Sequence, residues 1–211
     1  MKKAVLFDMD GVLVDSEPYN DSQLIEFSKA YDLPEHPKGF FIGNSEQYLW
    51  KHKAGEDQDR INYLKGELKK FRLGKDTPYA ELLDPEVPKV FRKLKEMGLK
   101  TAIASSSPLS EIEEVMKVAK IEEFVDFHIS GHSCKNHKPD PEIYLTAMKA
   151  LGVSAEEAMA VEDSTPGIQA AKSAGLFVCG RIPRTAGYDL DQSKADVRIL
   201  SLLEIFDYIG K

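Results

Sequence analysis

Two acidic side chains near the N-terminus have the type and the spacing to bind a divalent cation beside a phosphate group. Asp8 and Asp10 are separated only by Met9 and follow a run of apolar residues, 4–7. Gly11 comes next, and a glycine allows the backbone to turn sharply and to approach a ligand closely. Two carboxylates this close repel each other unless a cation or a shared proton lies between them, and Mg²⁺ prefers oxygen ligands. An isolated pair of this kind is most often a solvated acidic turn, so the rest of the chain decides the interpretation.

Three serines after a second apolar run could bind the oxygens of a phosphate. Ser105, Ser106 and Ser107 directly follow the segment 101–104 and precede Pro108. Hydroxyl groups and backbone N–H groups at the start of a helix suit an anion. Because Ser107 stands next to Pro108, the pattern assigns Ser107 to capping the helix, and Ser105 is the better ligand candidate.

A lysine in a later loop could neutralise a phosphate and a nearby carboxylate together. Lys138 follows His137 and precedes Pro139, and Pro139 and Pro141 stiffen the loop. On its own, such a lysine is usually a solvated loop residue. His137 is assigned to the polar surface of the loop and not to a role as a base.

A second acidic pair, Glu162 and Asp163, stands at the end of the apolar segment 158–162. This pair could complete an oxygen-rich divalent-cation site with Asp8 and Asp10. The alternative is an acidic helix N-terminus that complements the dipole of the helix that follows.

The elements that must position these residues alternate between strand and helix from residue 85 onward. Apolar periodicity, N-caps and terminal glycines predict strands at 99–104, 124–129, 158–162, 177–179 and 197–200, and helices at 85–98, 107–119, 140–152, 166–174 and 201–210. Together with the first strand, this alternation predicts an α/β fold with a doubly wound parallel sheet. All the candidate residues then follow carboxyl ends of strands, which is the edge where such sheets bind ligands.

The segment between the first strand and residue 83 has a different pattern of apolar residues. It shows helical patterns at 17–31, from 44 or 45 to 55, and from 57 to 71, without strand signals. The sequence therefore predicts a core formed by residues 1–15 and 83–211, with a small all-helical cap domain, 16–82, inserted into it. Basic residues of this insertion are assigned to a solvated helix face: Lys65, Lys69, Lys70, Arg72 and Lys75.

Composition limits the class of protein and its partners. The chain has 211 residues, of which 42% are hydrophobic and 30% charged, and this excludes wholesale disorder. The formal net charge is −7, so no general attraction to nucleic acid or to an anionic membrane is expected. No apolar run approaches the ~20 residues of a membrane span, and Cys134 and Cys179 suit a reducing compartment without disulfides. A cytoplasmic monomer is the expectation.

Taken in order, these motifs resemble those of the haloacid dehalogenase superfamily, in its β-phosphoglucomutase-like branch with a helical cap. The resemblance covers essentially the whole chain and includes the entry into the cap. It rests on Asp8-Met9-Asp10-Gly11-Val12, Asp15-Ser16-Glu17-Pro18, Ser105, Lys138-Pro139 and Glu162-Asp163-Ser164.

The resemblance implies a reaction and a role for each motif. Asp8 would be the nucleophile that becomes an aspartyl phosphate, and Asp10 would be the general acid and base. Mg²⁺ would be held by Asp8, the main-chain carbonyl of Asp10, Asp163 and, directly or through water, Glu162. Ser105 and Lys138 would hold the phosphoryl oxygens, assisted by backbone N–H groups of Ser106 and of Met9 to Gly11. The partner would be a small phosphorylated metabolite.

Two readings outside this enzyme class are less favoured. A signalling receiver domain also combines a phosphorylated Asp, an acidic pair, a Ser or Thr and a Lys on a doubly wound sheet. Its phospho-acceptor stands on a later strand, however, and it needs no inserted cap. An inactive binding module is disfavoured because every motif position keeps a competent residue.

Within the family, the sequence favours a phosphatase over a sugar-phosphate mutase. In the mutases, an arginine shortly after a cap glycine holds a second phosphate, and a histidine follows the cap entry by four residues. The matching stretch here is Gly43-Asn44-Ser45-Glu46, and Asn20 stands in the place of the histidine. Because Glu46 would repel a second phosphate, water is the expected acceptor, with the mutase as the alternative.

Overall fold

In the computed structural model, the apolar run before Asp8 forms the central strand of a parallel sheet. The structure describes residues 1–42, 46–188 and 190–210, and of residues 46 and 47 it describes only the backbone. Within these residues a six-stranded sheet has the order β3-β2-β1-β4-β5-β6, and every neighbouring pair is parallel. β1 therefore pairs with β2 on one side and with β4 on the other, which confirms the predicted doubly wound α/β fold.

The strands and helices lie close to their predicted positions. The strands are β1 Ala4–Phe7, β2 Lys100–Ser105, β3 Phe127–Ser130, β4 Ala158–Glu162, β5 Phe177–Arg181 and β6 Val197–Ile199. The α-helices are α1 Glu17–Ala30, α2 Glu46–Ala54, α3 Gln58–Phe71, α4 Tyr79–Leu82, α5 Val87–Glu96, α6 Leu109–Ala119, α7 Glu142–Leu151 and α8 Thr165–Ser173.

Two predicted elements differ from the structure, the first in its extent and the second in its kind. The expected strand 124–129 begins only at Phe127, because Glu122–Phe124 forms a short 3₁₀ helix. The last predicted helix is also a 3₁₀ helix, Leu202–Asp207. Its predicted capping box is present, since Ser201 and Glu204 each bond the other's backbone.

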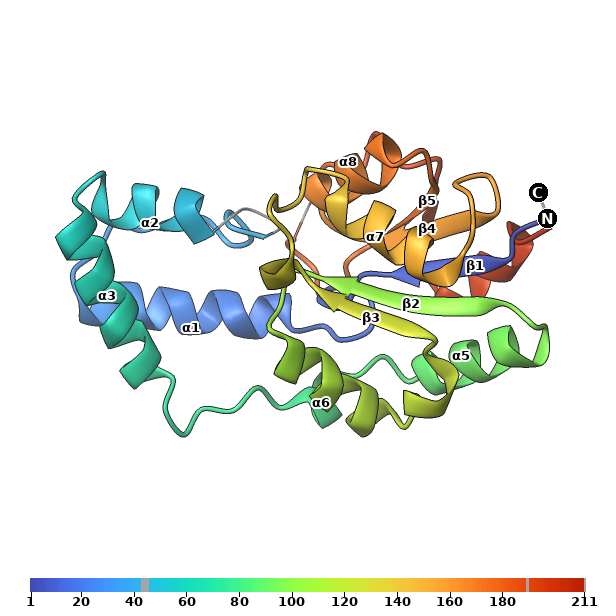
Figure 1. The fold of residues 1–211 in the computed structure, drawn as a ribbon. Helices are drawn as coiled ribbons and strands as arrows, with labels where there is room; N and C mark the ends of the chain where they lie inside the picture. The colour runs from blue at the N-terminus through green and yellow to red at the C-terminus, as the bar shows by residue number, and fades with distance from the viewer. Residues whose placement is uncertain (43–45, 189, 211) are drawn as a thin grey trace.

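Helices cover both faces of the sheet because the apolar residues of β1 alternate in direction. Val5 and Phe7 pack in one buried cluster with residues of α5 and α6, whereas Ala4 and Leu6 pack in another with residues of α7 and α8. The rings of Phe7 and Phe91 illustrate the first cluster, with centroids 4.7 Å apart. Figure 1 shows α5 and α6 on one side of the sheet and α7 and α8 on the other.

Helices α1, α2 and α3 form a separate unit beyond the carboxyl ends of the strands (Figure 1). Their own apolar cluster is built around Leu24, Phe27, Trp50 and Leu64. None of the helices in the described part of the chain combines the length and the apolar character of a membrane-crossing segment.

The chain crosses between this helical unit and the sheet at two adjacent places. Val14 and Leu83 form an antiparallel bridge. The N–H of Asp15 donates to the Leu82 carbonyl oxygen (2.9 Å), and the N–H of Asp84 donates to that of Leu13 (2.9 Å). We propose, on this basis, that the domain boundaries are those expected from the sequence: a cap of residues 16–82 and a core of residues 1–15 and 83–211.

A buried polar network stabilises the cap and connects it to the core. Lys53 Nζ lies 2.6 Å from His36 Nδ1, and His36 Nε2 lies 3.2 Å from Asp21 Oδ1. The other oxygen of Asp21 accepts hydrogen bonds from the Gly39 N–H and from the Tyr188 hydroxyl of the core. Because Lys53 can only donate, Nδ1 of His36 accepts and Nε2 carries the proton.

This network should make the cap sensitive to acid. Burial, and then repulsion by Lys53, lower the pKa of His36 below its usual value. The unfolded chain therefore takes up a proton at His36 before the folded chain does, and stability should fall as the pH falls below about 6.5. The contribution of one proton is at most about 1.4 kcal/mol per pH unit.

Urea unfolding at several pH values, followed by the fluorescence of Trp50, measures this effect, because Trp50 is the single tryptophan and lies in the cap cluster. His36→Asn should flatten the acid dependence, whereas the same change at the exposed His132 should leave it intact. Equal slopes in wild type and His36→Asn would contradict the prediction.

The close packing of α8 on β4 depends on a glycine. A Cβ placed on Gly167 would lie 1.9 Å from Glu162 Oε1 and 2.2 Å from Oε2. This carboxylate cannot easily move, because Lys138 and Tyr144 donate to Oε1 while Ser164 donates to Oε2. A side chain at position 167 is therefore excluded by the carboxylate of Glu162, which occupies the space that the side chain would need.

We expect Gly167→Ala to destabilise the protein by about 1–3 kcal/mol through overpacking. Gly66, in the exposed face of α3, is the matched control, since nothing lies within 4 Å of its added Cβ. Gly66→Ala should stabilise by about 0.5–1 kcal/mol because alanine is the better helix former. The midpoint of urea unfolding, measured for both variants, tests this prediction. Midpoints that shift in the same direction in both variants would contradict it.

Candidate active site

The candidate residues predicted from four separate strand ends lie together at the carboxyl edge of the sheet. Lys138, in the loop after β3, connects them. Its Nζ donates to Asp8 Oδ1 (2.7 Å), which follows β1, and to Glu162 Oε1 (2.5 Å), which ends β4. It also donates to the carbonyl oxygen of Ala104 in β2 (3.1 Å). One ammonium group therefore links β1, β2 and β4 at the point where their polar residues begin.

This environment stabilises the protonated form of Lys138. Burial alone would lower the pKa of Lys138, but attraction by Asp8 and Glu162 outweighs burial and holds the pKa well above its usual value. Lys138 is thus a cation fixed inside the site and not the solvated loop lysine that an isolated motif suggests.

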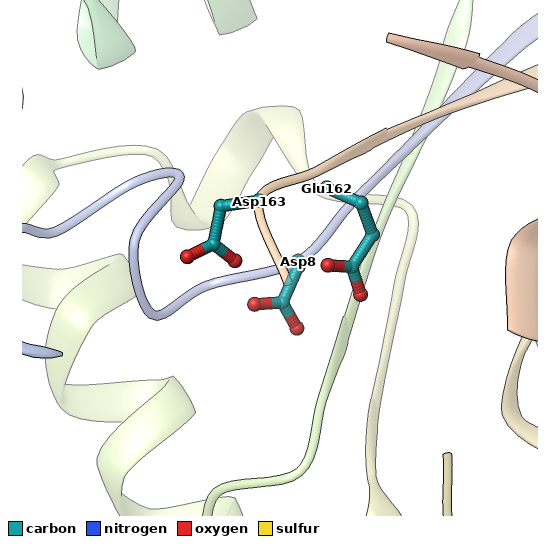
Figure 2. Close-up of side chains that lie close together, drawn as sticks. All are labelled: Asp8, Glu162 and Asp163. Atoms are coloured by element: carbon teal, nitrogen blue, oxygen red, sulfur yellow. The ribbon is translucent and has the colours of Figure 1, made fainter. Parts of the chain in front are cut away.

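Three buried carboxylates form a cluster that suits a divalent cation. Asp8, Glu162 and Asp163 each offer an oxygen, and these oxygens all lie within 4.8 Å of one another. Figure 2 shows the three side chains directed into the same space from the ends of β1 and β4. Oxygen ligands at this spacing match the preference of Mg²⁺.

The electrostatics of the cluster support the same conclusion. Burial, and then repulsion by Glu162 and Asp10, raise the pKa of Asp8 to about 8 despite the opposing attraction of Lys138. Burial and repulsion by Glu162 and Asp8 also raise the pKa of Asp163 well above its usual value. A cation bound between these groups would relieve the repulsion, so the residues present fit a divalent ion.

Glu162 differs from its two neighbours because its oxygens are already bonded by the protein. Tyr144 donates its hydroxyl to Oε1 (2.9 Å), where Lys138 also donates. The N–H and the hydroxyl of Ser164 both donate to Oε2 (3.2 Å each). This arrangement favours contact with a cation through water, one of the two alternatives drawn from the sequence.

Each carboxylate oxygen of Asp10 accepts a hydrogen bond from a serine hydroxyl group. Ser16, at the entry to the cap, donates to Oδ1, and Ser107, after β2, donates to Oδ2 (2.6 Å). The interpretation of Ser107 as a helix cap was wrong, because α6 has Pro108 at its N-cap without a side-chain capping bond. Whether the main-chain carbonyl of Asp10 binds a cation stays a prediction.

Two features of the structure require a glycine at position 11, directly after the acidic pair. Gly11 has a φ of +75°, and a Cβ there would lie 2.0 Å from Asp163 Oδ2. A side chain is therefore excluded both by backbone conformation and by the second acidic pair. The N–H of Gly11 donates to the Val14 carbonyl oxygen (2.8 Å), so this amide is engaged in the turn. Met9 is fully buried in the core beside it.

A cavity of about 620 Å³ lies over this group of residues. Its floor includes Asp8, Asp10, Ser105, Ser106 and Lys138. Ser105 is buried and accepts a hydrogen bond from the N–H of Ser107 (3.0 Å), while Ser106 is exposed. All the predicted phosphate-binding side chains therefore face one space.

Helices α1 of the cap and α6 of the core supply further residues of this cavity, of which sequence reasoning missed Tyr19, Gln23 and Glu111. Glu17, Tyr19, Asn20 and Gln23 of α1 line it, as does Glu111 of α6. A sequence signal for Gln23 is the three-residue spacing of Glu17, Asn20 and Gln23, which places these three on one helix face. Burial, and then repulsion by Asp10 and Asp8, raise the pKa of Glu17 to about 8.

The basic cap residues do not all lie on a solvated face, contrary to the expectation. Arg72 and Lys75 line the cavity, and Lys75 also pairs with Glu26 (3.4 Å). Lys70 does pair with Glu67 on the helix surface (2.7 Å). The segment just after α3 therefore brings two cations to the cavity, which the periodicity of the helix does not reveal.

The sequence predicts that this chain has an acid, Glu46, where the mutases have an arginine. The stretch concerned is Gly43-Asn44-Ser45-Glu46. Residues 43–45 and the Glu46 side chain lie outside the described part of the chain. Asn20, which takes the place of the mutase histidine, does line the cavity.

Comparison with known proteins agrees with the geometry. A family model for haloacid dehalogenase-like hydrolases matches residues 2–175. A phosphorylated carbohydrates phosphatase from Thermotoga maritima is 34% identical over 180 residues, which cover 82% of each chain. A β-phosphoglucomutase from Bacillus subtilis is 32% identical over 193 residues, which cover 84% of this chain and 82% of the relative.

Solved structures show the same fold. A β-phosphoglucomutase from Clostridium difficile superposes with a TM-score of 0.80 at 22% identity, covering 100% of this chain and 98% of the other. The family, the fold and the enzyme class predicted from the sequence are confirmed together: this chain is an enzyme that belongs to the haloacid dehalogenase-like hydrolases.

Proposed function

We propose that this enzyme hydrolyses small phosphate monoesters, sugar phosphates or similar metabolites, with Mg²⁺ as cofactor and Asp8 as nucleophile. The observation that carries the proposal is the position of Asp8, which pairs with the buried cation of Lys138 (2.7 Å) and belongs to one cluster with the carboxylates of Glu162 and Asp163. The Thermotoga relative, named for phosphorylated carbohydrates, supports the substrate class.

The cation has an assigned place in this proposal. Asp8 and Asp163 would hold Mg²⁺, with Glu162 directly or through water and with the main-chain carbonyl of Asp10. When bound, Mg²⁺ neutralises negative charge on the phosphoryl group and on Asp8.

The first half of the reaction transfers the phosphoryl group to the protein. An oxygen of Asp8 attacks phosphorus, and the bond between phosphorus and the ester oxygen breaks as the new bond forms. Asp10 gives its proton to the departing oxygen, which leaves as an alcohol. Ser105, Ser106 and Lys138 hold the phosphoryl oxygens, assisted by the backbone N–H groups of Met9 and Asp10, whereas the N–H of Gly11, also expected from the sequence to assist, is bonded to Val14.

The second half restores the protein. Asp10 takes a proton from a water molecule, whose oxygen attacks phosphorus, and the bond from phosphorus to Asp8 breaks. Ester and water become alcohol and inorganic phosphate. Ser16 and Ser107, which bond the two oxygens of Asp10, orient this carboxyl group in both halves.

Asp8→Asn should lower phosphate release from para-nitrophenyl phosphate and from sugar phosphates by on the order of 10⁴-fold or more, because the amide is a poor nucleophile. Chelation with EDTA should abolish release in the wild type, and added Mg²⁺ should restore it. Phosphate release is measured beside the exposed control Asp207→Asn, which should retain full activity. Undiminished turnover in Asp8→Asn or in EDTA would remove the proposed mechanism.

A mutase of the β-phosphoglucomutase type is the second candidate function. The Bacillus relative, which bears that name at 32% identity, favours it. Asn20 in place of the mutase histidine counts against it, as does the acid in the stretch that ends at Glu46. A phosphatase remains the better candidate because transfer to water requires no binding site for a second phosphate in the cap.

The two candidates predict different products from β-glucose 1-phosphate. We expect release of inorganic phosphate with little glucose 6-phosphate, because water is the acceptor. A coupled assay for glucose 6-phosphate, run beside a phosphate assay on the same samples, measures both products. Efficient isomerisation with negligible phosphate release would reverse the choice.

A further inference from the structure

The cap side of the cavity contains a side chain that the proposed chemistry does not use. Gln23 lies on α1, three residues after Asn20, and both line the cavity. The neighbouring Leu24 is buried in the apolar cluster of the cap. One side of α1 is therefore fixed by packing while the other presents amide side chains to the space above Asp8.

Gln23 has an unsatisfied polar atom. Its Oε1 is buried and has no hydrogen-bond partner within the described structure. Native proteins rarely leave a buried carbonyl oxygen unpaired, because its lost contact with water is then not compensated. Since this side chain lines the cavity, a bound ligand is the natural source of the missing partner.

The chemical group that satisfies Gln23 follows from the amide itself. The oxygen needs a donor, and the adjoining NH₂ group needs acceptors. A hydroxyl group can do either, so it satisfies Gln23 whichever way the amide is turned. A phosphate or carboxylate of the ligand can only accept and would leave the oxygen unpaired.

The other walls of the cavity agree with a hydroxylated ligand. The cations Arg72 and Lys75 stand among acids that include Glu17 and Glu111, so the walls present no field of one sign for a second anion. Phe41 and Leu49 add apolar surface against which the C–H groups of a carbon chain can pack. The volume of about 620 Å³ leaves room for an alcohol between Asp8 and α1.

Resting on the proposed phosphatase reaction, we infer that Gln23 determines specificity by binding a hydroxyl group of the leaving alcohol. The preferred substrates are then phosphate esters of polyhydroxylated alcohols, such as sugars and sugar alcohols, and Asn20 offers a second amide to an adjacent hydroxyl. Gln23 acts on the alcohol and not on the phosphate, so its effect depends on which ester is hydrolysed.

The wild-type protein tests the inference without any substitution. With Mg²⁺ present, kcat/KM is compared for sorbitol 6-phosphate and for hexyl phosphate, which has the same carbon chain without hydroxyl groups. We expect a preference of at least about tenfold for the hydroxylated ester, because a polar site rejects a ligand that leaves it unpaired. Equal values would overturn the inference.

The variant Gln23→Met keeps the length of the side chain and removes its hydrogen bonds. It should lower kcat/KM for sorbitol 6-phosphate by about 10- to 100-fold, and this loss should exceed the loss on para-nitrophenyl phosphate by at least about tenfold. The matched control is Gln58→Met in α3, where the exposed amide donates to Asn62 (3.1 Å) and the activity should not change.

The outcomes separate this inference from the proposed function. Equal losses of Gln23→Met on both esters would overturn the specificity role while the phosphatase reaction stands. A wild-type protein that releases no phosphate from any ester would remove the reaction and the inference with it. Trp50 fluorescence shows whether Gln23→Met is folded, and the wild-type comparison decides the question if it is not.

Discussion

The bridge that Lys138 makes between Asp8 and Glu162 is the interaction on which the site depends. Buried carboxylates at this separation repel one another strongly, and removal of their common cation would leave uncompensated charge in the interior. The bridge also reaches the carbonyl oxygen of Ala104, so it ties neighbouring strands at their polar ends. The site is therefore assembled by charge compensation as much as by the sheet.

The sheet makes that bridge possible because it delivers each partner to one edge. Parallel strands β1, β2 and β4 lie side by side, with Phe7 in register with both Ile103 and Val161. The residues that follow these strands must then be neighbours. Among the cap side chains that the structure describes, none forms an ion pair with Asp8, Glu162 or Asp163. The cap forms another wall of the cavity.

This division explains how much could be predicted from the sequence. Asp8, Lys138, Glu162 and Asp163 could be placed together because short apolar runs and turn residues specify strand ends, and the topology does the rest. Ser107 could not be placed, because whether its hydroxyl turns toward the helix or toward Asp10 depends on the loop geometry. Gln23 carried no motif at all, and its importance appears only as a missing hydrogen bond.

The side-by-side crossings at Val14 and Leu83 have an evolutionary consequence. The inserted segment leaves and re-enters the core at adjacent residues. The sheet can therefore form whatever the length or the sequence of the insertion. A cap of another size or composition can be accommodated at the same two ends without disturbing Lys138 or its carboxylates. On the proposed function, exchange of the part of this segment beyond Ser16 would change which alcohols are accepted while the residues that react with phosphorus are kept.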